Sequence, residues 1–275
     1  MYKILVLSFL VAPTLLPAQD QDNPQEWLGT ERLRFYVQAF FPALDTDVRL
    51  DSASGEIGTT IDFEQNLGLS DTVTVPAAGF AWRFADRHRL RFDYFRLERS
   101  SASVSTSEIR FGNSVFQADL PLSSFFDTDV YTLGYSYSVL SNRNAEIGLI
   151  AGLSVQDIAL GIKNSRGPAF VEEESAVTAP LPSFGVTGAY LLNDKWVLRA
   201  IASYFALELS LSDEEDIGGE IINLEAGIEY IAAKNVSIDQ RFSYFNLSAN
   251  FTNERRLTEI KYQYRGPKLG IIGRF

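Results

Sequence analysis

The sequence contains no cysteine and a single histidine, and its 24 basic residues are outnumbered by 35 acidic ones. Without cysteine the chain can form neither a disulfide nor a metal-thiolate site. A chain with this excess of acid repels nucleic acid, so no nucleic-acid partner is expected. Hydrolytic mechanisms that use histidine as a base near neutral pH would have to use the lone histidine, His88. We predict no cofactor and no bound metal.

Long hydrophobic runs are also lacking, because no apolar stretch beyond the first 18 residues approaches the length of about 18 that a membrane-crossing helix needs. At the start of the chain, Lys3 precedes an apolar core from Ile4 to Leu16, and Ala18 precedes a polar stretch. This arrangement is typical of a secretory signal peptide. The sequence therefore predicts a signal peptide over residues 1–18 and a single domain over residues 19–275.

Aromatic residues are abundant, with 20 Phe, 12 Tyr and 3 Trp, and apolar residues alternate with small or polar ones in several segments. In residues 131–139, Tyr131, Leu133 and Tyr135 share one face, and the intervening residues are small or polar. The same period of two recurs in residues 33–39, 146–155 and 222–230. This period indicates strands. Long strands with tyrosine-rich apolar faces favour a barrel with lipid outside and a polar lumen inside.

The connections between these segments are of two kinds that alternate along the chain. The tight turns are expected at 85–88, 141–144, 193–195 and 232–235. The longer loops are expected at about 43–71, 101–126, 164–178, 212–217 and 251–257. Four turns and five loops join ten strands, an even number as outer-membrane barrels require. The predicted fold class is an all-β, transmembrane, antiparallel up-and-down β-barrel of about ten strands, with eight or twelve as alternatives.

Some segments change phase partway along. In residues 89–98 the apolar side chains move from even to odd positions after Tyr94, and residues 195–211 alternate poorly. A β-bulge or the exit of the strand from the bilayer would explain each change. In residues 259–275 the phase changes at Gly266-Pro267, where proline predicts a bulge or an edge.

The mature sequence resembles the small β-barrel outer-membrane proteins of Gram-negative bacteria over essentially its whole length. Such proteins end in a signal read by the barrel-assembly machinery: a polar residue, a glycine two positions on, a hydrophobic residue three further, and a terminal aromatic residue. Lys268, Gly270 and Phe275 fit this signal, whereas Gly273 stands at the hydrophobic position. The resemblance implies a cell outer-membrane location reached with a cleaved signal peptide. It also implies contact with outer-membrane lipid, lipopolysaccharide and the assembly machinery. Residues 59–71 resemble a segment of proteobacterial barrels that has no assigned role.

Barrel enzymes of this membrane include omptin proteases, phospholipase A, a palmitoyl transferase and a lipid A deacylase, and resemblance to any of them implies a catalytic histidine. His88 falls in a predicted tight turn at the periplasmic end, whereas those enzymes act at the outer rim or in the outer leaflet. We therefore interpret His88 as a turn residue and predict that the protein is not an enzyme.

Acidic clusters occur in two predicted loops, at Glu172–Glu174 and at 213–216, and Asp62 and Glu64 lie in the first loop. Such carboxylates could hold a divalent cation that bridges to lipopolysaccharide phosphates, but a solvated polar loop is the simpler interpretation. In the first loop the alternation of apolar residues between Ile61 and Leu67 indicates a segment that packs against the barrel.

If the apolar faces contact lipid, charged residues of both signs face the lumen. The predicted lumen charge network comprises Arg34, Arg83, Arg91, Asp93, Glu225, Glu229, Asp239, Arg241, Lys261 and Arg265. Unpaired charges there would be costly, so they either pair and plug the lumen or line a narrow wet path. A ten-stranded barrel is close to the size that side chains fill. The sequence favours a plugged barrel with a structural or surface-interaction role. The alternative is a narrow, porin-like passive channel or a transporter for small solutes or apolar molecules.

Overall fold

The computed structural model describes residues 31–52, 54–164, 172–212, 215–253 and 256–275. The predicted signal peptide lies outside the described residues. The strands are β1 (Leu33–Phe40), β2 (Ala43–Leu50), β3 (Ile61–Asp62), β4 (Val75–Ala85), β5 (His88–Val104), β6 (Ile109–Phe111), β7 (Ser114–Phe116), β8 (Pro121–Ser141), β9 (Ala145–Asn164), β10 (Glu172–Asn193), β11 (Trp196–Ser212), β12 (Glu215–Ala233), β13 (Val236–Asn253) and β14 (Arg256–Arg274). Within these ranges no helix has the length and apolar character needed to cross a membrane.

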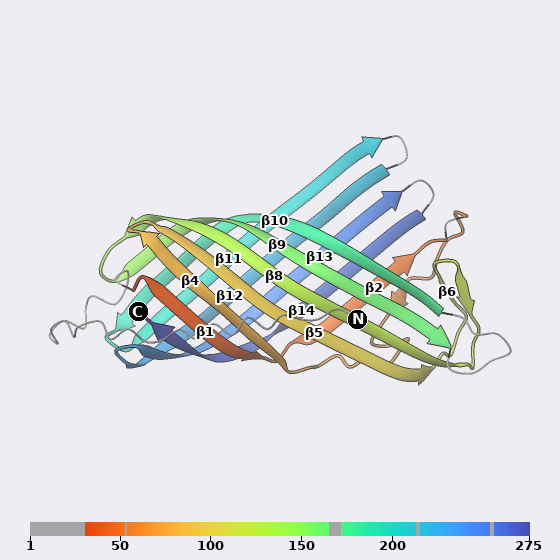
Figure 1. Ribbon diagram of the computed structural model, residues 1–275, viewed down its shortest axis with the longest axis horizontal. Helices are drawn as coiled ribbons and strands as arrows, with labels where there is room; N and C mark the ends of the chain where they lie inside the picture. The colour runs from red at the N-terminus through yellow and green to blue at the C-terminus, as the bar shows by residue number, and fades with distance from the viewer. Residues whose placement is uncertain (1–30, 53, 165–171, 213–214, 254–255) are drawn as a thin grey trace, which may run out of the picture.

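Ten strands form a closed antiparallel ring in the order β1-β4-β5-β8-β9-β10-β11-β12-β13-β14 (Figure 1). The ring closes where β1 pairs with β14, with Arg34 opposite Arg274. Beyond Phe41 and Pro42 the chain continues as β2, which pairs with the other half of β14, so β1 and β2 together make one wall strand. The predicted all-β barrel of ten antiparallel strands is confirmed.

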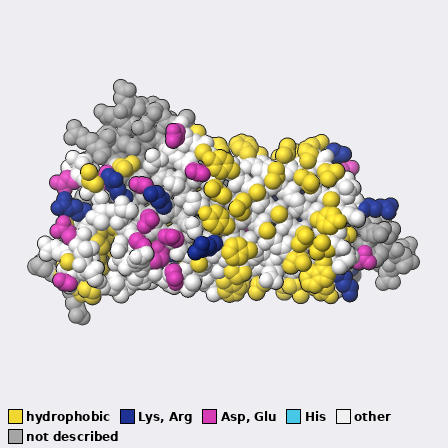
Figure 2. Space-filling view, turned by 180° about the vertical axis from the view of Figure 1, so that it is seen from behind, with side chains coloured by type: hydrophobic (Ala, Val, Ile, Leu, Met, Phe, Trp, Pro, Cys, Tyr) yellow, Lys and Arg dark blue, Asp and Glu magenta, His cyan; other side chains and the backbone are white. Residues whose placement is uncertain are grey.

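The two ends of the barrel differ. We call the end that carries the tight turns and Phe275 the turn end, and the opposite end the loop end. Around the turn-end half, large apolar side chains point outward and form a belt (Figure 2). The belt includes Phe35, Val37, Trp82, Leu133, Leu149, Val186, Leu198, Leu224, Ile238, Phe242, Leu269 and Ile271. A transmembrane strand needs about 9–11 residues, and the segment Tyr131–Leu140 of β8, whose outward side chains are apolar, has that length.

Most strands continue well past the belt; β8 has 21 residues and β10 has 22. In this loop-end half the polarity of the wall is inverted, because charged side chains face out (Figure 2) and apolar side chains face in. The interior core there includes Leu44, Val48, Phe63, Val75, Phe95, Leu97, Phe126, Ile158, Leu160, Phe245, Leu247, Ile260, Tyr262 and Tyr264. The predicted loops are accordingly too long at several places, since residues 43–50, 121–126 and 172–178 are strand.

This inversion explains the phase changes in the sequence. On β5, Tyr94 points outward at the border of the belt, and Phe95 and Leu97 are buried inside. The strand leaves the bilayer without shifting register against β8. On β14, pairing with β13 is likewise continuous through Gly266 and Pro267. The predicted bulge is therefore wrong, whereas the alternative, an edge, describes the other side of β14, where the ladder is interrupted between Arg265 and Lys268. The interruption lies on the opposite side, at Phe41: a Cβ on Gly266 would stand 2.1 Å from the Phe41 carbonyl oxygen.

The loop-end half is open at two places in its hydrogen-bonded wall. Between β2 and β5 the space is occupied by residues 54–74, whose Ile61, Phe63 and Leu67 side chains are completely buried, as their alternation predicted. Between β10 and β11, pairing stops at Phe184 opposite Tyr204. Beyond this point β10 pairs with β9 alone and β11 with β12 alone. The β11–β12 and β13–β14 hairpins, which remain joined by the pairing of β12 with β13, project beyond the fork at the loop end (Figure 1).

Two prolines explain the second opening. Pro180 and Pro182 lie on β10 directly beyond Phe184, and both are in register with β9 with no break in that ladder. Their nitrogens therefore face β11, where a proline cannot donate a hydrogen bond. We call the point of separation, Leu181–Phe184 on β10 and Tyr204–Leu207 on β11, the fork.

Candidate binding cavity in the lumen

The lumen of the turn-end half is crossed by a network of charged side chains in two layers. Nearest the turn end, Glu229 is fully buried and accepts from Arg34 at 2.7 Å and from Arg199 at 2.6 Å. Arg274 lies 3.8 Å from Glu229 and 3.6 Å from Glu31. The ring register makes this possible, because β1, β11, β12 and β14 each present an inward residue at the same height.

Glu146 anchors the opposite wall of this layer. Both of its carboxylate oxygens accept from Arg83, at 2.9 and 2.8 Å, and Ser138 also donates to it. Arg89 reaches one of these oxygens at 3.2 Å. Arg89 therefore shares a carboxylate whose two oxygens both already accept from Nη2 of Arg83.

The second layer lies nearer the middle of the belt and centres on Glu225. Arg91 contacts Glu225 at 3.3 Å and Asp93 at 2.7 Å, and Lys268 donates to Glu225. Arg241 lies 3.7 Å from Glu225 and pairs with Asp239 at 2.8 Å. The Tyr36 hydroxyl donates to Asp93 and the Gln38 amide to Asp239, each at 2.7 Å. Charged side chains from β5, β12, β13 and β14 and polar ones from β1 are thus paired across the lumen.

The structure places eight of the ten predicted network residues toward the lumen: Arg34, Arg83, Arg91, Asp93, Glu225, Glu229, Asp239 and Arg241. Lys261 and Arg265 face outward instead, and Lys261 pairs with Glu259 on the surface. The prediction was wrong for these two because it took Tyr262 and Tyr264 as lipid-facing, whereas both are buried in the loop-end core.

Sequence reasoning missed six members of the network: Glu31, Arg89, Glu146, Arg199, Lys268 and Arg274. Glu146 was recognisable, since it shares the small, polar face of β9 with Gly148 and Gly152. Arg199 lies in a strand whose alternation is poor, so its direction could not be assigned from the pattern.

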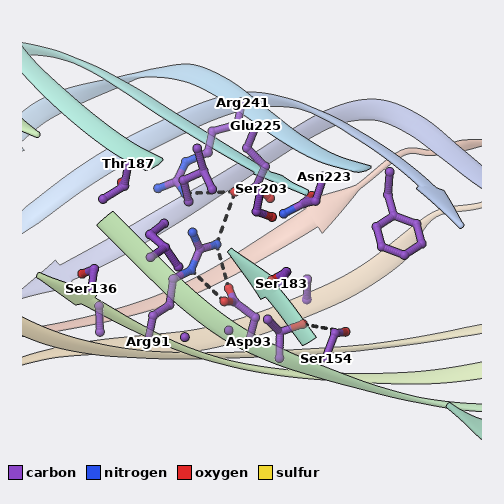
Figure 3. Close-up of a pocket in the computed structure, with 18 of the residues that line it drawn as sticks. Arg91, Asp93, Ser136, Ser154, Ser183, Thr187, Ser203, Asn223, Glu225 and Arg241 are labelled. Carbon is purple, nitrogen blue, oxygen red and sulfur yellow. Dashed lines mark hydrogen bonds and ion pairs between the residues drawn. The ribbon is translucent and has the colours of Figure 1, made fainter. Parts of the chain in front are cut away.

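A cavity of about 180 Å³ lies beside this network (Figure 3). One wall is made of the charged layer, with Arg34, Arg89, Arg91, Asp93, Arg199, Glu225, Arg241 and Lys268. The facing wall, on β8 to β12, is made of small or polar side chains that include Gly134, Ser136, Ser154, Ser183, Thr187, Ser203 and Asn223. A Cβ on Gly134 would meet no atom within 4 Å, so the space persists where the wall residues are smallest.

The cavity is bounded toward the loop end by apolar residues. Phe95, Leu181, Ile221, Phe245 and Tyr264 line it there. Toward the turn end, Ala189, Leu191, Val197 and Ile231 pack together as a small separate cluster. The cavity therefore lies between two apolar layers, with the charged network along one side.

The predicted surface features fall elsewhere. His88 is the first residue of β5; its ring nitrogen Nδ1 lies 2.6 Å from the Tyr135 hydroxyl, and the ring packs on Phe84 and Tyr137. It belongs to the outward aromatic girdle of the turn end, away from the cavity. Among the described residues no group of three or more acidic or histidine side chains is arranged to hold a metal. Residues 213 and 214 lie outside the described residues.

The residues of the predicted assembly signal lie on β14. Lys268 points inward to Glu225, and Phe275 points outward, 64% exposed, with its carbonyl oxygen accepting from the amides of Arg32 and Leu33. Gly270 faces Gln38, whose side chain would lie 2.4 Å from an added Cβ. This packing accounts for the glycine, while its role in assembly stays a prediction.

Comparison with known proteins identifies the fold. No family model matches the sequence, and no curated protein matches it. Among solved structures, the outer-membrane protease OmpT from Escherichia coli superposes with a TM-score of 0.59 at 11% identity, covering 90% of this chain and 98% of that chain. The translocator domain of the autotransporter NalP from Neisseria meningitidis has a TM-score of 0.48 at 13% identity and covers 90% of each chain. The toluene transporter TodX from Pseudomonas putida has a TM-score of 0.37 at 10% identity, covering 89% of this chain and 90% of that chain. The chain has the fold of an outer-membrane β-barrel protein.

Proposed function

We propose that the protein is a closed, non-enzymatic barrel of the outer membrane with a structural or surface-interaction role. In this proposal residues 1–18 are a cleaved signal peptide, the turn end faces the periplasm and the loop end faces outward, as in barrels with short periplasmic turns. Its partners are outer-membrane lipid, lipopolysaccharide and, during biogenesis, the barrel-assembly machinery. The observation that carries the proposal is the change from a charged lumen to a packed apolar interior along the same strands.

Closure of the barrel rests on this interior. In the loop-end half, side chains from the wall and from residues 54–74 fill the space; Phe63, Phe126 and Tyr262 are completely buried and pack on one another. Interiors of this kind are close-packed and leave few voids larger than a water molecule. Ions entering from the loop end would have to cross this apolar layer without water, which is strongly unfavourable.

The proposal that the protein is not an enzyme is supported by the position of His88. The residue stands among the aromatic side chains of the turn end, on the outer surface of the barrel. A general base has to come within hydrogen-bond reach of the reacting group and of a nucleophile, and the lumen side chains lie on the other side of the wall. OmpT is a protease by its name, and the shared fold does not transfer that activity.

Conductance of the refolded mature chain, residues 19–275, in a planar bilayer tests closure. We expect no steady unitary conductance under conditions in which a 16-stranded porin, as positive control, conducts. Correct folding is checked on the same sample by a change of gel mobility on boiling. Steady unitary steps from folded protein would overturn the closed-barrel proposal and support the narrow-channel alternative.

A further inference from the structure

We propose that the lumen cavity is a binding site for a small organic anion, a carboxylate or phosphate group on a hydroxyl-bearing body, which enters at the fork between β10 and β11. This site goes beyond the closed-barrel role and does not depend on whether the barrel conducts.

The charge of the lumen selects an anion. The described network has eight cationic side chains, Arg34, Arg83, Arg89, Arg91, Arg199, Arg241, Lys268 and Arg274, and six anionic ones, Glu31, Asp93, Glu146, Glu225, Glu229 and Asp239. The difference is two positive charges in a chain whose net charge is −11. At the cavity itself the imbalance is larger, because six of the cations and only Asp93 and Glu225 among the anions line it. Excess buried charge is costly unless it is compensated.

Among the cations that line the cavity, Arg89 has the longest shortest ion pair with a carboxylate. It contacts Glu146 at 3.2 Å, whereas Arg83 holds both oxygens of that carboxylate. A guanidinium has five N–H donors in a fork that suits carboxylate and phosphate. Arg89 lines the cavity. An anion in the cavity would therefore accept hydrogen bonds from the N–H groups of Arg89 that do not bind Glu146.

The facing wall is suited to hydroxyl groups. Ser136, Ser183, Ser203 and Asn223 line the cavity from four strands (Figure 3), and hydroxyl and amide side chains both donate and accept. The size of the site limits the ligand, since pockets for drug-sized molecules have about 300–1,000 Å³ and this one has about 180 Å³. A ligand with the dimensions of glycerol phosphate is appropriate.

The fork provides the route. At the fork the cavity is lined by Leu181 and Ser183 of β10. On β11 it is lined by Ile201 and Ser203, which are still paired with β10 and lie just before the fork. Beyond the pair Phe184–Tyr204 the described residues of β10 and β11 are not paired with each other, and Pro180 and Pro182 have no N–H to donate toward β11. Leu181 and Ser183 are partly accessible, as are Ser154 and Gly152 opposite them on β9, and Gln156, the next inward residue of β9 toward the loop end, is completely buried. Phe184 and Tyr204, which are outward and exposed, place the fork at the border of the apolar belt.

Calorimetric titration of the folded mature chain with glycerol 1-phosphate tests the site, with glycerol as the neutral comparison. We expect saturable binding of the phosphate and none of glycerol. Gly134→Leu fills the cavity and should abolish binding. Arg89→Gln leaves Glu146 paired with Arg83 and should weaken binding about tenfold, the effect of one charge-assisted hydrogen bond. Val139→Leu, which places leucine on the lipid side of the same strand, is the control and should bind like the wild type. Gel mobility before and after boiling confirms that each variant is folded.

Nanodiscs of neutral or anionic lipid distinguish the source of the anion. If phosphatidylglycerol competes with glycerol phosphate, the natural ligand is a lipid headgroup; if it does not, the ligand is a soluble anion. Either result supports the site. Failure of the wild type to bind, or equal binding by folded Gly134→Leu, would overturn it.

Discussion

Phe184 of β10 and Phe205 of β11 face each other across the fork, with ring centroids 6.3 Å apart and an interplanar angle of 47°. Phe184 is an outward residue at the border of the belt, and Phe205 is the first inward residue of β11 beyond the last pair with β10. The two rings therefore meet where the paired wall ends, next to the cavity-lining residues Ser183 and Ser203. The contact between the two rings covers the proposed entrance.

Phe184→Ala should accelerate ligand exchange more than it changes affinity. The substitution removes the ring that covers the fork and leaves the cavity wall intact. Losing a contact of about 1 kcal/mol from the closed state would raise the association rate about fivefold. Stopped-flow tryptophan fluorescence with glycerol 1-phosphate measures it. Phe242→Ala, which removes an equally exposed belt residue on β13, is the control, and an equal acceleration there would contradict a specific role for Phe184.

Replacing Pro180 and Pro182 with alanine should extend the β10–β11 ladder. The two alanines restore two backbone N–H donors, and each hydrogen bond that they form adds about 1 kcal/mol to the free energy of unfolding. About the same free energy is lost because alanine makes the unfolded chain more flexible than proline does. We therefore expect little change in global stability but slower amide hydrogen exchange at residues 205–208 and slower ligand association. Pro121→Ala, at the start of β8, is the control. Unchanged exchange at 205–208 would show that the prolines do not keep the fork open.

Much of the architecture could be predicted because a lipid-facing strand has a simple signature. Tyr131, Leu133 and Tyr135 alternate with small lumen residues, and the tight turns interrupt this pattern at regular places. The loop-end half could not be predicted in the same way, since there the solvent lies outside and the core inside. The side chain of Tyr262 has the same character as that of Tyr135, but it is buried rather than lipid-exposed. Periodicity identifies the two faces of a strand but does not indicate which of them points into the barrel.

The cavity was still harder to foresee. Its charged wall combines residues from distant strands, for example Arg91 of β5 and Glu225 of β12, and no spacing in the sequence joins them. Its small wall was visible as alternating serine and glycine on β8 and β9, but this pattern is equally compatible with tight side-chain packing. The fork did have a local signal, the two prolines in β10, whose importance depends on knowing which neighbour their nitrogens face.

Glu229→Gln should destabilise the folded barrel strongly. Glu229 is fully buried and touches Arg34, Arg199 and Arg274, and the lumen already has more cations than anions. Removing one anion from such a network typically costs about 3–5 kcal/mol. Urea unfolding followed by gel mobility measures the loss. Arg89→Gln removes a surplus cation and should cost much less, so equal losses from both variants would contradict the assigned excess of positive charge.

Asp47→Asn should stabilise the packing of residues 54–74 against the barrel near neutral pH. Burial, followed by repulsion from Asp62 and Asp45, raises the pKa of Asp47 above its usual value of 3.8, although Lys261 opposes this. A carboxyl whose pKa is raised in the folded state loses stability as the pH rises through that pKa, because only the folded protein resists its ionisation. The advantage of asparagine should therefore be present at pH 7 and disappear toward pH 3. Urea unfolding at the two pH values checks this, with the outward Asp157→Asn as control.

Arg99→Gln should release residues 54–74 while leaving the belt half of the barrel intact. Arg99 is buried on β5; it pairs with Glu64, donates to the Thr46 hydroxyl at 2.7 Å and lies 5.1 Å from the Phe126 ring centroid. It thereby joins β5 to β2 through the segment that fills the space between them. Leaving Glu64 unpaired in this position costs about 3 kcal/mol. When cleavage follows local opening of the segment, this cost should speed cleavage at Glu56 and Glu64 by a glutamate-specific protease about a hundredfold. Arg96→Gln, on the same strand, removes an exposed pair with Glu98, and such pairs contribute little. Equal protection in the Arg99 and Arg96 variants would show that packing of Ile61, Phe63 and Leu67 alone holds the segment in place.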